Sequence, residues 1–388
     1  MTAGLESKRL AFIDRVIETV PAYLDALKDT GRPGRFFPCA RGRTPLGGKL
    51  VLGFSCLALK TYYILGLWDR LEPGHRREWL DLIKSFQTGE RHRNPLLANS
   101  FSDPALVADL GSTGRKASAA FQALRHPRTW WRNRAKAGPI SALEAAVIAE
   151  TKQAISSLVQ VGDKPDRPYE ALLALYPRPK EYIEKLDWTT PWRAGGQAAA
   201  VVVFARLGKE SASDTEIPYD RWLTDSENFY AGICDPDTGS YFTGARPGYT
   251  QLVNGAMKVL TALDWLEIEI HRPERLIDTV LSSLPEPGGC HMVDSVYVLH
   301  QCLGQVEYRR KDIIRYCNNV VEMLAKHRKP DGGFSYQADR NADIYYGVKF
   351  AEGLDISDLH GTSLLCWAIS MILDLCQVED RGLKNLRP

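Results

Sequence analysis

The stretch that bears most directly on the fold is Lys329-Pro330-Asp331-Gly332-Gly333-Phe334-Ser335-Tyr336. Aspartate and glycine favour a tight turn, and the aromatic ring that follows can close the end of a pair of helices. Two related loops precede it at intervals of roughly forty to fifty residues, at 234–242 and 285–290. Because this interval fits one helical hairpin plus its loop, the loops predict a repeat of helical hairpins.

Between these loops, apolar residues recur every three or four positions, for example at Ile313, Val320, Val321 and Leu324. This period is typical of amphipathic α-helices, and convincing strand-like alternation is absent. We therefore expect an all-α protein. The pattern predicts helices near residues 5–29, 47–71, 75–88, 104–125, 142–160, 193–208, 217–231, 247–270, 291–304, 309–328 and 359–377, with short helices between them.

Composition narrows the classes of protein further. The 388 residues are 44% hydrophobic and 25% charged, which excludes a disordered chain or a small disulfide scaffold. Lysine and arginine number 49 against 47 acidic residues, a formal charge of +2, so the chain is no polycation built to coat nucleic acid. Any electrostatic specificity must be local.

Targeting signals are also absent from the sequence. The longest apolar run, 50–67, is interrupted by Lys60 and is too short for the roughly 20 uncharged residues of a membrane span. Charged residues within 1–18 leave no room for a signal peptide. The eight cysteines include no Cys-x-x-Cys pair, as in proteins with reduced thiols. We expect a cytoplasmic protein without a membrane span.

The three loops and the helix start Asp358-Leu359-His360-Gly361-Thr362 resemble the repeats of α/α toroids. That superfamily includes terpenoid cyclases, the β subunits of protein prenyltransferases, and many glycoside hydrolases and polysaccharide lyases. The resemblance covers about 187–378 and implies a ring of probably six helical hairpins with an active site in the cavity at one end. It implies one domain over 1–388, in which 1–140 completes the ring or adds an elaborating N-terminal lobe.

Two branches of that superfamily lack their signatures here. A class II terpenoid cyclase carries an Asp-x-Asp-Asp motif, and the nearest match, Asp235-Pro236-Asp237-Thr238, is followed by a turn glycine. A prenyltransferase β subunit binds zinc through an Asp-x-Cys element, whereas Asp294-Ser295-Val296 has valine in place of the thiolate. We therefore expect no metal and no cofactor.

One candidate group opens the helix near 193–208. Asp187, Trp188, Trp192 and Arg193 place a carboxylate, two indoles and a guanidinium in one short stretch. Indoles stack on sugar faces or isoprenoid chains, and arginine holds an anion. The alternative is structural, with the indoles closing a hairpin and the arginine bridging to a neighbour.

A second candidate group is His291, Asp294 and Tyr297, which are three residues apart and share one face of a predicted helix. An imidazole oriented by a carboxylate can act as a general base or acid, and a phenol can donate a proton. A hydrogen-bonded polar seam between packed helices would give the same pattern.

The last repeat adds His360 as a catalytic candidate and Tyr336 as a substrate-binding one. Asn254, with Arg246 and Tyr249 just before it, adds a polar spot to an otherwise apolar helix. Amide, histidine, tyrosine and arginine are the residue types that a polysaccharide lyase uses to acidify and abstract a proton beside a uronate. The same types also occur at the ends of many ordinary helices.

Two acid-free basic stretches lie in the N-terminal half, at 30–68 and 110–143. Such stretches attract phosphates, diphosphates, uronates or an acidic partner, and they also occur as solvated basic faces. No nucleic-acid-binding signature accompanies them, so we expect an anionic small molecule or oligosaccharide as the partner and no nucleic acid.

These observations favour a carbohydrate-active enzyme, a glycoside hydrolase or a polysaccharide lyase, working on an acidic or bacterial-surface saccharide by general acid and base catalysis. In a hydrolase two carboxylates flank the bond, and Asp187 and Asp294 are the pair to consider first. One alternative is a terpenoid cyclase or prenyltransferase-like enzyme acting on an isoprenoid diphosphate. Another is a non-catalytic toroid that binds a glycan or a protein.

Overall fold

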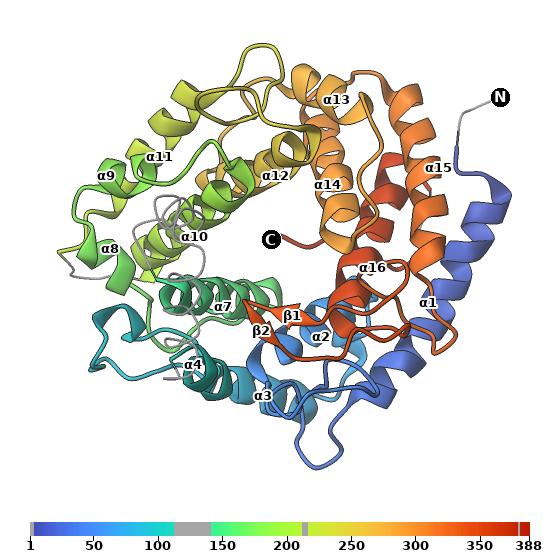
Figure 1. Cartoon of the computed structure of the whole chain (residues 1–388), viewed down its shortest axis with the longest axis horizontal. Helices are drawn as coiled ribbons and strands as arrows, with labels where there is room; N and C mark the ends of the chain where they lie inside the picture. The colour runs from blue at the N-terminus through green and yellow to red at the C-terminus, as the bar shows by residue number, and fades with distance from the viewer. Residues whose placement is uncertain (1–3, 112–140, 212–215, 379–380) are drawn as a thin grey trace, which may run out of the picture.

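The computed structural model describes residues 4–111, 141–211, 216–378 and 381–388. Over these residues the chain is mostly helical, so the predicted all-α class is confirmed. The helices nearest the centre of Figure 1, called the inner helices below, are α2 (Leu52–Ile64), α7 (Ala142–Gln160), α10 (Pro191–Ser211), α12 (Tyr249–Leu266), α14 (Gly289–Gln305) and α16 (Leu359–Leu375).

The remaining helices lie around them (Figure 1). They are α1 (Ser7–Leu27), α3 (Pro73–Lys84), α4 (Pro104–Leu110), α8 (Ala171–Leu175), α9 (Pro179–Glu184), α11 (Tyr219–Ile233), α13 (Pro273–Leu281) and α15 (Arg310–His327). The other regular elements of the described residues are short. They are the 3-10 turns η1 (Trp68–Arg70) and η2 (Pro95–Leu97) and a small hairpin of β1 (Ile344–Tyr345) and β2 (Val348–Lys349). No described helix is both long and apolar enough to cross a membrane.

The inner helices contact one another in a closed cyclic order. From α7 the contacts run to α10, α12, α14, α16 and α2, and α2 contacts α7 again. Nearly every residue of α2 and α16 is buried, as expected for helices covered on all sides, whereas α15 buries one apolar stripe. The core therefore lies between the inner helices and the surrounding ones.

A glycine pair sets the spacing of α10 and α12. A Cβ atom on Gly195 would lie 3.0 Å from the Cβ of Lys258 and 3.3 Å from the carbonyl oxygen of Gly255. A Cβ on Gly255 would lie 2.8 Å from the Cβ of Pro191. Gly195 and Gly255 thus let these two inner helices approach closely, since a side chain at either position would push them apart.

The repeated loops share a local geometry. Residues 234–241 and 328–334 each follow a surrounding helix and contain one antiparallel bridge. In each loop the second residue of the bridge is aromatic, and its ring is buried. The same loop geometry occurs twice in the N-terminal half, where the sequence did not predict it. The four bridges are Lys28–Phe36, Gln87–Phe101, Cys234–Tyr241 and Arg328–Phe334.

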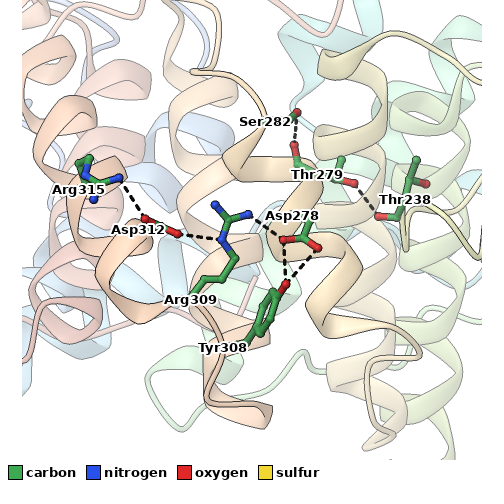
Figure 2. A network of polar contacts seen from close by, with 8 residues as sticks. All are labelled: Thr238, Asp278, Thr279, Ser282, Tyr308, Arg309, Asp312 and Arg315. Carbon is green, nitrogen blue, oxygen red and sulfur yellow. Dashed lines mark hydrogen bonds and ion pairs between the residues drawn. The ribbon is translucent and has the colours of Figure 1, made fainter.

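A polar network joins the surrounding helices α13 and α15 (Figure 2). The Arg309 guanidinium donates to Asp278 at 2.8 Å and to Asp312 at 2.9 Å, and Tyr308 also donates to Asp278 at 3.3 Å. Thr279 of α13 donates to the carbonyl of Thr238 at 2.8 Å. The contacts of Arg309 are exposed, whereas the Thr279–Thr238 hydrogen bond is buried, and together they hold neighbouring elements of the chain to one another.

Residues 381–388, called the tail below, cross the C-terminal ends of several inner helices. The Lys384 N–H donates to the Ile64 carbonyl of α2 at 2.8 Å, and the Arg387 N–H donates to Gln160 of α7 at 2.8 Å. The Arg387 guanidinium pairs with Asp264 of α12 at 2.6 Å and lies 4.3 Å from the Trp265 ring. The tail therefore covers the end of the molecule opposite the repeated loops.

Candidate active site in the central cavity

A cavity of about 800 Å³, called the central cavity below, lies between the inner helices. Its walls come from α2, α7, α10, α12, α14 and α16, from the tip of the β1–β2 hairpin, and from the tail. Residues at the start of inner helices, such as Trp192 and His360, line it, and so do Leu386 and Pro388 of the tail. The central cavity thus extends from the helix starts to the tail.

The described lining carries positively charged side chains and no aspartate or glutamate side chain. Lys60 comes from α2, Lys152 from α7, Lys258 from α12 and Arg193 from the start of α10. Among the described residues none of the three lysines, called the lysine trio below, has an acidic partner within ion-pair distance. The Lys60 ammonium donates to the Ser156 hydroxyl at 2.9 Å.

The lysine trio is electrostatically coupled. The pKa of Lys60 is lowered to about 8, mainly by burial and in smaller part by the charge of Lys258. Burial likewise lowers the pKa of Lys152 to about 7, with Lys258 and Lys60 adding to the shift. Because like charges repel in a poorly solvated space, this arrangement stabilises a bound anion.

A second group lies at the start of α10, α12 and α14. The Asn254 side-chain amide hydrogen-bonds Nδ1 of His291 at 2.9 Å, and the His291 ring lies 5.3 Å from the Trp192 ring. Burial lowers the pKa of His291 below its usual range, so the imidazole is neutral at pH 7. Asn254 fixes the ring, and Nε2 has no hydrogen-bond partner among the described residues.

A third group surrounds the start of α16. The Tyr336 ring stacks on the His360 ring with centroids 5.1 Å apart, and both His360 and Cys290 line the central cavity. Burial lowers the pKa of His360 to about 4, and Lys258 adds to this shift. Asp358 is not a catalytic partner for His360, because its oxygens accept from the backbone N–H groups of Tyr336, Ala342 and Gly361.

Asp294 and Tyr297 lie deeper on α14 and do not line the central cavity. Asp294 is 1% exposed, and burial raises its pKa to about 6, partly offset by Lys258. Its Oδ2 atom has no hydrogen-bond partner. Tyr297 is fully buried against the Trp367 ring at 5.5 Å. Both residues therefore belong to the protein core rather than to the cavity wall.

Tyr346 reaches the central cavity from the tip of the β1–β2 hairpin. It adopts a φ of 43°, an unfavourable conformation for a tyrosine, and its hydroxyl donates to Gln153 at 3.2 Å. The neighbouring Tyr345 hydroxyl donates to Glu150 at 3.3 Å, and burial raises the pKa of Glu150 to about 8.

Four residues proposed from the sequence lie elsewhere. Trp188 is 2% exposed, donates to the Ile183 carbonyl at 2.9 Å and packs against Phe229. The Tyr249 hydroxyl donates to the Val280 carbonyl at 2.9 Å. Asp187 accepts from Thr189 and Thr190 beside the start of α10, and Arg246 is exposed in a loop. None of these four lines the central cavity.

Lys152 and Lys258 line the central cavity but were not proposed as site residues from the sequence. Lys258 is a single basic residue among apolar neighbours, as Lys60 is within the apolar run 50–67, whereas Lys152 stands between the polar residues Thr151 and Gln153. A lysine on a helix that is apolar all round must face a cavity or a charged partner. Of the two basic stretches, 30–68 contributes Lys60, and most of 110–143 lies outside the described residues.

No model of a known protein family matches this sequence, and no curated protein does so either. A search of solved structures finds a chain named "Polysaccharide Lyase BACCELL_00875", which is 12% identical and has a TM-score of 0.41. The alignment covers 97% of this chain and 100% of that one. At this TM-score the two chains are not shown to share a fold.

Proposed function

We propose that this protein is an enzyme that acts on an acidic saccharide in the central cavity by general acid and base catalysis. One observation carries the proposal: the described lining holds Lys60, Lys152, Lys258 and Arg193 and no aspartate or glutamate side chain. A cavity with this charge attracts and orients an anionic substrate. The cyclic order of the inner helices supports the toroid of six helical hairpins that the sequence predicts.

The charge distribution favours elimination over hydrolysis. Hydrolysis by a pair of carboxylates needs both groups beside the scissile bond. Asp294 is buried behind the wall, and Asp187 is held by Thr189 and Thr190. In an elimination, by contrast, cations stabilise the charge that develops when a proton is removed beside the substrate's carboxylate.

His291 is the base that the geometry supports best. Burial lowers the pKa of its imidazole and favours the neutral form, and Asn254 fixes the ring. His291 does not itself line the central cavity, but its ring lies 5.3 Å from that of Trp192, which does. In the proposed step His291 takes the proton beside the carboxylate, a carbon–carbon double bond forms, and the glycosidic oxygen on the adjacent carbon leaves. A cavity ammonium group or the Tyr346 hydroxyl donates the proton to that oxygen.

The test is incubation of the purified protein with a panel of acidic oligosaccharides, followed by mass spectrometry. Elimination gives two products whose masses sum to that of the substrate, whereas hydrolysis adds one water. His291→Gln is expected to abolish cleavage, while Arg246→Gln, which removes an exposed charge away from the cavity, retains it. Products that contain the added water would refute elimination.

The apolar part of the cavity supports a second candidate, an enzyme acting on an isoprenoid diphosphate. Large stretches of the wall consist of alanine, leucine, isoleucine, methionine and tryptophan side chains, including Leu57, Ile148, Met257, Leu364 and Trp367. Apolar walls suit a hydrocarbon chain, and lysines suit its diphosphate. Conversion of a prenyl diphosphate by the same protein, with no saccharide cleaved, would favour this candidate.

A further inference from the structure

We infer that Lys60, Lys152 and Lys258 form a binding site for a phosphoryl group carried by the substrate. The inference deepens the proposed function and rests on it for the saccharide that carries the group. The anion site itself is defined by the described residues of the cavity wall and can be tested without any turnover.

The lysine trio comes from helices on different sides of the ring. In the cyclic order of contacts, α2 and α7 are neighbours, whereas α12 is separated from α2 by α16 and α14. All three side chains nevertheless line the same cavity. In agreement with this, the charge of Lys258 contributes to the lowered pKa of both Lys60 and Lys152. An anion bound between these lysines would therefore be contacted by ammonium groups from different walls of the cavity.

In the part of the chain that the structure describes, no acidic side chain neutralises the trio. No carboxylate lies within ion-pair distance of these lysines among the described residues. Asp294 is close enough for Lys258 to lower its pKa, but the two do not form an ion pair. Partly buried charges without a partner cost free energy, and a bound anion removes that cost.

The number and kind of these groups fit a phosphoryl group better than a carboxylate. A phosphate monoester carries a charge of about −1.5 to −2 at pH 7 and three strong acceptor oxygens. Lysine binds phosphate as a point charge, whereas the planar fork of arginine matches a carboxylate. Arg193, at the start of α10, remains available for a carboxylate on the same substrate.

Isothermal titration of the full chain with inorganic pyrophosphate tests the site, with acetate at the same ionic strength as the reference anion. We expect pyrophosphate to bind at least ten-fold more tightly than acetate, and Lys258→Met to weaken pyrophosphate binding about ten-fold or more. Lys326→Met, which removes an exposed lysine of α15, should leave binding unchanged. Methionine keeps the apolar stem, so the variants should fold, as circular dichroism will verify.

Pyrophosphate binding no tighter than acetate binding, or equal binding by Lys258→Met and the wild type, would overturn the inference. The two proposals fail separately. Saccharide cleavage without pyrophosphate binding would refute the phosphoryl site alone, whereas pyrophosphate binding without cleavage would leave it standing and remove support from the enzyme. Titration with a hexose 1-phosphate and with geranyl diphosphate then identifies the carrier, because the correct one binds more tightly than pyrophosphate.

Discussion

Replacing Lys152 with methionine is expected to stabilise the ligand-free protein. Burial lowers the pKa of Lys152 from 10.5 to about 7, and Lys258 and Lys60 contribute to the shift. The ammonium group therefore costs the folded state free energy, a cost that the hydrated unfolded chain does not have. Methionine keeps the unbranched apolar stem and removes the charge.

The magnitude follows from the two pKa values. One pKa unit corresponds to about 1.4 kcal/mol, so the difference between 10.5 and about 7 gives an upper limit of roughly 4 kcal/mol at pH 7. The side chain is partly exposed to the cavity, where water screens the charge, so we expect a gain of about 2 kcal/mol. Between these pKa values the unfolded chain binds more protons, so wild-type stability rises with pH in this window.

Urea unfolding at pH 7 and at about pH 10 is the appropriate assay. The advantage of Lys152→Met should be complete near pH 7 and below, and it should shrink towards zero as the pH approaches 10.5. Lys326→Met, on the exposed face of α15, is the matched control and should change stability little at either pH. A Lys152→Met protein less stable than the wild type at pH 7 would refute the reasoning, since it would mean that the ammonium group has a stabilising partner.

Three further predictions concern other parts of the molecule. Asp294→Asn removes a buried charge and should raise the free energy of unfolding at pH 7 by roughly 1 kcal/mol. Because burial raises the pKa of Asp294 to about 6, the stability of the wild type falls as the pH rises from about 4 to 6. A gain in stability that persists at pH 3 would contradict this cause. Trp188→Ala should destabilise the protein by roughly 3 to 5 kcal/mol in the same assay, and a loss below about 1 kcal/mol would place the indole outside the core. Arg387→Ala should speed amide hydrogen exchange in residues 381–388 while the inner helices stay protected, and exchange that rises throughout would show that the tail holds the whole fold together.

Much of the fold was predictable because the helices have strong periodic patterns and clear ends. The expected helix at 142–160 coincides with α7, and the one at 359–377 ends two residues beyond α16. The hairpin of β1 and β2 was not predicted, since two paired residues on each strand carry no alternation. The N-terminal loop at 28–36 was missed because Gly34 and Phe36 are separated by an arginine, whereas Gly333 and Phe334 are adjacent.

The candidate site was harder to predict, because neighbouring residues in the sequence face different environments. Trp188 and Trp192 occupy the same short stretch, yet the first is in the core and the second lines the central cavity. Asn254 and His291 were proposed from different repeats, and only the packing of α12 on α14 brings them within 2.9 Å. Lys152 and Lys258 face the same cavity only because the inner helices that carry them are arranged in a closed cyclic order.

The position of the tail limits how a long substrate could be handled. Leu386 and Pro388 line the central cavity, and the tail crosses the helix ends on that side. In the proposed enzyme, a substrate that fills the cavity would contact these two tail residues, and the tail would favour a chain terminus or a short fragment over an inner segment of a long polymer. Degradation of a long polysaccharide would therefore proceed from chain ends, releasing small products from the outset while the average length of the remaining polymer falls slowly.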